Sequence, residues 1–126
     1  MESVFVYGTL RPPRPGRPGD DSLFYHHIAS YVRSAVPACL QGADLYDLGA
    51  YPAARPGQAV LQGDLLRIQP AALALTDRIE GHPDLFRRER VTVQAEAGPA
   101  LAWIYWARAE MVAGKPLIPG GDWFAR

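Results

Sequence analysis

Hydrophobic residues recur along this 126-residue chain with two different periods, which outline most of its predicted elements. Runs of β-branched and aromatic residues, some alternating with polar positions, predict β-strands. The predicted strands cover residues 4–6, 38–46, 59–68, 88–95 and 101–106. Apolar residues three and four positions apart predict helices over 23–32 and 70–81. Strands dominate and two helices are inserted among them, so we expect an α+β fold built on a small mixed β-barrel.

Glycine and proline residues divide these elements and predict where the chain turns. Gly42 interrupts the second strand and predicts a β-bulge there. The proline-containing segment 51–57 predicts a turn before the third strand, and Pro99 predicts the end of the fourth. The stretch 11–19 is rich in proline, glycine and arginine, which predicts a surface loop.

A short glycine-containing segment, Tyr7-Gly8-Thr9-Leu10, follows the first predicted strand directly. Gly8 can adopt a positive φ or let a ligand approach the backbone closely. The amides of Gly8, Thr9 and Leu10 can then converge on an anion, as nests of backbone N–H groups do. A glycine turn after a strand is also a common plain connection. The segment by itself favours that simpler interpretation.

A glutamate, Glu80, occupies the last turn of the second predicted helix. Pro70 suits the start of this helix and Gly81 suits the position just past its end. A carboxylate at this end faces the negative pole of the helix dipole, and Asp77 lies one turn earlier. Both effects raise the pKa of Glu80 if the side chain is partly buried, as proton transfer near neutral pH requires. By position alone, a solvated surface glutamate is the more frequent case.

These two segments stand among five motifs whose order along the chain resembles the γ-glutamylcyclotransferase-like superfamily. The motifs are V-F-V-Y-G-T-L at 4–10, Y-D-L-G-A-Y-P at 46–52, V-L-Q-G-D-L-L at 60–66, D-R-I-E-G at 77–81 and F-R-R at 86–88. The opening Y-G-T-L is similar to the AIG2-like and γ-glutamylamine cyclotransferase branch. Thr76, Phe86 and Asp64 depart from the leucine, tyrosine and glutamate that are usual there. None of these departures touches Glu80 or the first loop.

The resemblance implies a barrel with a pocket beside it and an intramolecular aminolysis that releases 5-oxoproline from a small γ-glutamyl substrate. It implies that Glu80 is the catalytic acid and base, that the site binds substrate through Tyr7, Gly8, Thr9 and Leu10, and that no cofactor is needed. Strand alternation places Tyr105 on the face opposite its neighbours. Tyr105 is therefore a candidate substrate-binding residue, although an ordinary core or surface tyrosine is equally compatible with its position.

The composition fits a single domain over residues 1–126, because a chain of this length can bury a core without disulfides or a bound metal. Formal net charge is zero, so we expect neither nucleic acid nor an anionic membrane as a partner. Cys39 is the single cysteine, which excludes an internal disulfide and fits a reducing compartment. No signal peptide precedes the first strand, and no apolar run reaches the roughly 20 residues that span a bilayer. We therefore expect a cytoplasmic protein.

The three histidines, His26, His27 and His82, have no zinc-ligand spacing, so we predict no metal site. The identity of the leaving amine and the oligomeric state stay open. Two other functions also stay open. A non-catalytic binding module on the same fold is one, because folds do not fix function. An amide hydrolase in which Glu80 activates water is the other.

Overall fold

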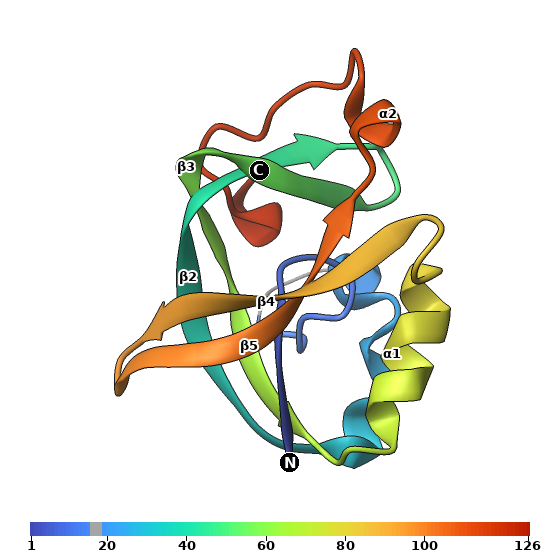
Figure 1. The fold of residues 1–126 in the computed structure, drawn as a ribbon, viewed down its shortest axis with the longest axis vertical. Coiled ribbons are helices and arrows are strands. Elements are labelled where there is room, and N and C mark those ends of the chain that lie inside the picture. Colours follow the sequence, from blue (N-terminus) through green and yellow to red (C-terminus); the bar gives the residue numbers. More distant parts are fainter. Residues whose placement is uncertain (16–18) are drawn as a thin grey trace.

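The computed structural model describes residues 1–15 and 19–126, and in this part of the chain five strands form a closed barrel (Figure 1). The strands are β1 (Glu2–Val6), β2 (Val32–Asp47), β3 (Pro52–Ile68), β4 (Phe86–Ala95) and β5 (Gly98–Ala107). Their order around the barrel is β1-β3-β2-β4-β5, and all pairs are antiparallel except β1 with β5. The predicted α+β fold with a mixed barrel is confirmed.

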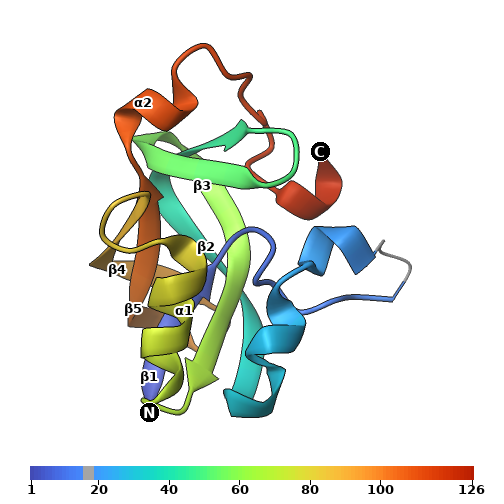
Figure 2. The ribbon, with the colours of Figure 1, turned by 90° about the vertical axis from the view of Figure 1, so that its right-hand side faces the viewer.

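Two α-helices are inserted, but only one lies where the sequence predicts it. Helix α1 (Ala72–Glu80) falls within the predicted segment 70–81 and runs along the outside of the barrel (Figures 1 and 2). The second, α2 (Ala109–Val112), is a single turn after β5. None of the helices among the described residues is both long enough and apolar enough to cross a membrane.

The helix predicted over 23–32 is wrong. The chain there forms short 3-10 turns, and β2 already begins at Val32, which pairs with Ile68. Ile28 is fully buried while its neighbours stay partly or largely exposed. A single buried residue can be placed by a short turn and does not need a helix with a continuous apolar face. The 3-10 elements are η1 (Gly19–Ser22), η2 (Tyr25–His27), η3 (Ala29–Tyr31) and, at the C-terminus, η4 (Trp123–Ala125).

Pro52 and Pro99 lie within strands, where the sequence predicts a turn and the end of a strand. Segment 51–57 belongs mainly to β3, because Pro52 is the first residue of that strand, where a missing N–H is tolerated. Pro99 lies inside β5 opposite Gln94, and the chain turns just before it. The predicted bulge is confirmed: the register of β2 shifts around Gly42, whose φ is 81°.

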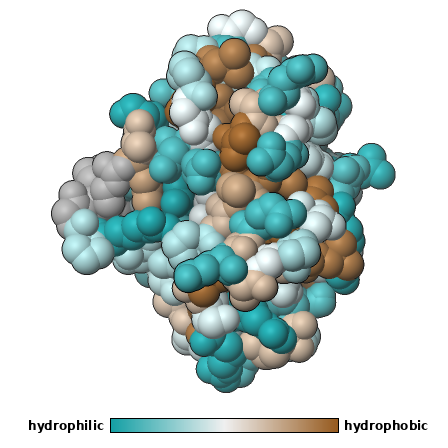
Figure 3. Space-filling model, turned by 90° about the vertical axis from the view of Figure 1, so that its left-hand side faces the viewer, coloured by the Kyte–Doolittle hydropathy of each residue, from teal (hydrophilic) through white to brown (hydrophobic). Residues whose placement is uncertain are grey.

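The core has two parts that share β1. Phe5 points into the barrel with Leu61 and Ile104, whereas Val4 and Val6 point outwards into a second cluster that includes residues of α1. Trp123 of η4 closes the barrel interior with only 1% of its surface exposed. On the face shown in Figure 3, polar side chains interrupt the apolar ones, so the hydrophobic surface there is not continuous.

Candidate active site

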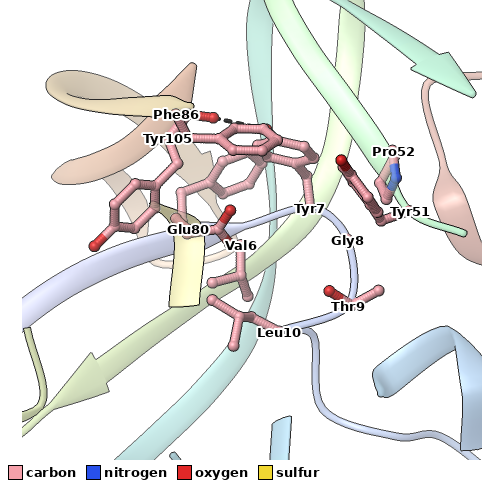
Figure 4. A pocket seen from close by; sticks show the side chains of 11 residues that line it. Val6, Tyr7, Gly8, Thr9, Leu10, Tyr51, Pro52, Glu80, Phe86 and Tyr105 are labelled. Atoms are coloured by element: carbon pink, nitrogen blue, oxygen red, sulfur yellow. Dashed lines mark hydrogen bonds between the residues drawn. The ribbon is translucent and has the colours of Figure 1, made fainter. Parts of the chain in front are cut away.

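Glu80 and the segment 7–10 line one pocket, although they lie some seventy residues apart in the sequence (Figure 4). Glu80 reaches it from the last residue of α1, and the loop reaches it from the end of β1. The described residues that line it are Phe5, Val6, Tyr7, Gly8, Thr9, Leu10, Tyr51, Pro52, Glu80, Phe86 and Tyr105. The geometric expectation from the sequence is confirmed, and every predicted site residue lies at this pocket.

The Glu80 carboxyl group has the electrostatic setting that the sequence predicted, but from a single cause. Burial raises its pKa from 4.5 to about 7. The residue as a whole is partly exposed, and among the described residues its carboxylate has no hydrogen-bond or ion-pair partner. The helix ends directly after it, because Gly81 takes the left-handed conformation with φ of 67°. The expected contribution of Asp77 to this pKa is absent.

Asp77 is instead occupied by partners from two strands. Its carboxylate accepts two hydrogen bonds from Arg88 of β4, at 2.8 and 3.0 Å, and one from the Tyr105 hydroxyl of β5 at 2.6 Å. Burial favours a higher pKa for Asp77, but these hydrogen bonds and the charge of Arg88 outweigh burial and hold the pKa below its usual value. Sequence reasoning missed Arg88 because no spacing signal links it to the helix.

The two tyrosines of the pocket form its walls, and their hydroxyl groups are already engaged. Tyr7 donates to the carbonyl oxygen of Tyr105 at 2.6 Å and accepts from the amide of Ala54 at 3.3 Å. The Tyr105 hydroxyl contacts both Asp77 and Thr76, the latter at 2.6 Å. Burial raises the pKa of Tyr7 and of Tyr105, with the negative charge of Glu80 adding to both. These phenols therefore hold the site together rather than offer a free acid.

The loop between β1 and Arg11 is fixed through its carbonyl groups. The Gly8 carbonyl accepts from the Arg11 amide at 2.9 Å, and the Thr9 carbonyl accepts from the Phe24 amide at 3.1 Å. Within the described part of the chain, the amides of Gly8, Thr9 and Leu10 have no protein acceptor. These three donors are thus unpaired within the described residues, and their binding of an anion stays a prediction.

Glycine is needed at position 8 for a reason other than a positive φ, which Gly8 does not adopt. A Cβ atom there would lie 2.7 and 2.9 Å from two side-chain atoms of Pro52. Of the two alternatives predicted for Gly8, the positive φ is not adopted, and the close approach of a ligand stays a prediction; the neighbour that the structure shows is Pro52. Pro52, Tyr51 and Phe86 are lining residues that sequence reasoning did not assign to the site. Tyr51 and Pro52 lie in a quoted motif, but no rule of spacing aims them at Glu80.

The pocket contains Glu80 as an acid and no lysine, arginine or histidine in its lining. The hydrogen-bond donors that the lining offers are therefore uncharged: hydroxyl groups and backbone amides. Among the described residues, no three histidine, cysteine, aspartate or glutamate side chains are grouped as a metal site would need. The arrangement suits a reaction in which a carboxylate moves protons beside a set of backbone donors.

Comparison with known proteins agrees with the motifs. A family model described as "Gamma-glutamyl cyclotransferase, AIG2-like" matches residues 4–125. The chain belongs to this family. Among the relatives of this AIG2-like chain is the gamma-glutamylcyclotransferase family protein YtfP of Escherichia coli K12. It is 30% identical over 123 residues, which cover 98% of this chain and 96% of the relative.

Solved structures in the same family share the fold. The solution structure of ytfP from Escherichia coli superimposes with a TM-score of 0.64 at 30% identity, covering 96% of this chain and 95% of that one. The crystal structure of an AIG2-like protein from Mus musculus gives a TM-score of 0.70 at 21% identity, covering 93% and 85%. The second likeness supports the barrel architecture alone.

Proposed function

We propose that the protein is a γ-glutamyl or γ-glutamylamine cyclotransferase, which converts a γ-glutamyl compound into 5-oxoproline and a free amine. The observation that carries the proposal is that a carboxyl group, whose pKa is raised to about 7, shares one pocket with residues 8–10, and that neither it nor their three amides have a partner among the described residues. Family membership supports the same reaction class. A γ-glutamyl group carries an amine and a carboxylate on one carbon. Its binding site therefore needs a proton acceptor for the amine close to hydrogen-bond donors for the carboxylate.

The amides of Gly8, Thr9 and Leu10 bind the α-carboxylate of the substrate or the oxyanion that develops on its γ-carbonyl. The pocket offers no basic side chain for this purpose. Holding the substrate in its bent conformer brings the α-amine within reach of the γ-carbonyl carbon. Much of the rate then comes from proximity, because the nucleophile belongs to the same molecule as the bond that it attacks.

Glu80 carries the protons. Its carboxylate takes a proton from the bound α-ammonium group, and the freed amine forms a C–N bond to the γ-carbonyl carbon. The protonated Glu80 then gives a proton to the departing nitrogen as the original amide C–N bond breaks. Glu80 then takes the second proton from the new ring nitrogen and returns it to the released amine, so two protons pass from the α-nitrogen to the leaving amine and Glu80 ends as it began. A pKa near 7 suits a group that must accept and return a proton at neutral pH.

The test is product identity. Purified protein is incubated with a panel of γ-glutamyl dipeptides and γ-glutamyl amines, including γ-glutamyl-ε-lysine and a γ-glutamyl polyamine, and products are read by mass spectrometry. We expect 5-oxoproline and one released amine in equal amounts. Release of free glutamate instead identifies a hydrolase. Binding of substrate without any product, seen by calorimetry, identifies a non-catalytic binding module.

A further inference from the structure

Arg11, which directly follows the loop of free amides, is buried rather than exposed at the surface as the sequence predicts. Its side chain is only 3% exposed. The rest of the predicted loop 11–19 includes residues 16–18, which lie outside the described residues. Burial of a guanidinium group is costly unless it is paired, so the position of Arg11 needs an explanation.

Two carboxylates from distant parts of the chain hold Arg11. Its Nε donates to Asp64 of β3 at 2.8 Å, and a terminal nitrogen donates to Asp122 at 2.8 Å. Its guanidinium group lies 4.0 Å from the centre of the Phe124 ring. Arg14 also pairs with Asp64, so two arginines and two aspartates balance in charge. Two of its five N–H donors are used in this way, and Arg11 is not among the residues that line the pocket.

The C-terminal segment thereby reaches the substrate loop. Figure 2 shows this segment, in red, beside the loop that follows β1. Its backbone is fixed to β3, because the Gly121 carbonyl accepts from the Gln62 amide at 2.8 Å. Asp122 also accepts from the Phe124 amide at 2.9 Å, which begins η4. One carboxylate therefore joins the end of the chain to the residue that ends the amide loop.

We infer that Arg11 is a positioning residue, and that Asp64 and Asp122 hold it as a clamp that keeps the amides of residues 8–10 aligned. This inference rests on the proposed function for its catalytic consequence, whereas its structural content stands independently. Buried ion pairs add little net stability on average. The benefit of this one is a fixed geometry at the loop, where a misplacement of about 1 Å can cost on the order of a hundredfold in rate.

Asp122→Asn tests the clamp without removing a buried arginine. One carboxylate oxygen, Oδ1, accepts from both Arg11 and the Phe124 amide, so asparagine keeps that acceptor and removes only the charge of the ion pair, while Asp64 still pairs with the guanidinium group. Asp21→Asn is the matched control. Asp21 pairs with Arg126 of the same C-terminal segment at 3.1 Å and contacts neither Arg11 nor the loop in any described interaction. Both variants thus lose one ion pair of the tail, and only Asp122→Asn weakens the hold on Arg11.

Two readouts are compared with the wild type. Steady-state kinetics should show a loss of about ten- to a hundredfold in kcat/KM for Asp122→Asn, through both KM and kcat, and less than a twofold loss for Asp21→Asn. Backbone order parameters from NMR should fall for residues 8–10 only in Asp122→Asn, from the roughly 0.85 of rigid backbone. Arg11→Lys, which keeps the charge without the fork, should resemble Asp122→Asn.

Equal losses in the two aspartate variants would show that the tail contributes only general stability and would overturn the clamp. Unchanged order parameters at residues 8–10 in Asp122→Asn overturn it as well. If wild-type protein forms no 5-oxoproline from any substrate of the panel, the proposed function fails, and the order parameters alone decide whether the clamp exists.

Discussion

Two carboxylates one turn apart on α1 have pKa values that are shifted in opposite directions. Asp77 is paired with Arg88 and Tyr105, and its pKa lies below the usual value. Glu80 has no partner among the described residues, and burial raises its pKa to about 7. Both belong to one short helix, so neither the helix dipole nor local sequence separates them. The difference comes from which strand faces each side chain. The ion pair with Arg88 gives Asp77 a structural role. Glu80 has no such pair among the described residues, so its carboxyl group is free to exchange a proton.

The largest expected effect follows from removing the unpaired carboxylate. Glu80→Gln keeps the shape of the side chain but cannot accept a proton, so we expect kcat/KM to fall by about 10²–10⁴-fold. Substrate binding, measured by calorimetry, should change little. Glu89→Gln, at an exposed position of β4, is the matched control for loss of one glutamate. A Glu80→Gln variant within a few-fold of wild-type activity would remove Glu80 from the mechanism.

The proximity of Glu80 to residues 7–10 could be predicted from the sequence, and the roles of their neighbours could not. Five motifs in order resemble a family whose chemistry implies a base and a set of anion donors at one centre, and this resemblance, not either segment alone, gave the prediction. Arg88 and Asp122 reach Asp77 and Arg11 only through strand register and the path of the tail, which local patterns do not encode. The strands could be predicted because hydrophobic alternation is visible within one strand. The side-chain pairings could not, because they join residues that lie far apart in the sequence.

Local patterns also explain the errors at 23–32 and 51–57. Apolar spacing in the first segment resembles a helical stripe, yet Ile28 is its one fully buried residue. In the second, Pro52 and Pro56 suggest a turn, but pairing with β2 draws the chain into a strand. In both cases tertiary contacts override propensity.

Breaking the paired carboxylate should mainly affect stability. Asp77→Asn removes the charge that receives two hydrogen bonds from Arg88, so we expect a loss of about 1.5–3 kcal/mol in the free energy of unfolding at pH 7. Because the folded pKa of Asp77 is depressed, this contribution is present above the unfolded pKa and is lost as pH falls through the folded value. Urea unfolding at pH 7 and at about pH 3 checks both statements. An equal loss at the two pH values would contradict the ion-pair explanation.

For the unpaired carboxylate of Glu80, the free energy of unfolding should change with pH in the opposite direction. The folded pKa of Glu80 is raised, so its neutral form stabilises the fold below about pH 4.5, and this stability is lost as pH rises through about 7. Glu80→Gln stays neutral throughout. We therefore expect the variant to exceed the wild type by on the order of 1–3 kcal/mol at pH 8, allowing for the partial exposure of the residue as a whole, and to match it at pH 4. Denaturant unfolding at both pH values measures this. A variant less stable than wild type at pH 8 would mean that the glutamate is held by an interaction of its ionised form.

The smallest expected effect is that of Asp77→Asn on the pH dependence of the rate. If Glu80 acts as the base, kcat/KM should fall about tenfold per pH unit below pH 7, because the protonated carboxyl group cannot take the proton of the α-ammonium group. Asp77 adds nothing to the raised pKa of Glu80, so Asp77→Asn should leave this acid limb in place even where it lowers the overall rate. Initial rates of 5-oxoproline release between pH 5 and pH 9, for wild type and Asp77→Asn, provide the comparison. An acid limb near pH 4, or one that moves with Asp77→Asn, would mean that the two carboxylates act as one coupled pair, and the contrast between them would no longer hold.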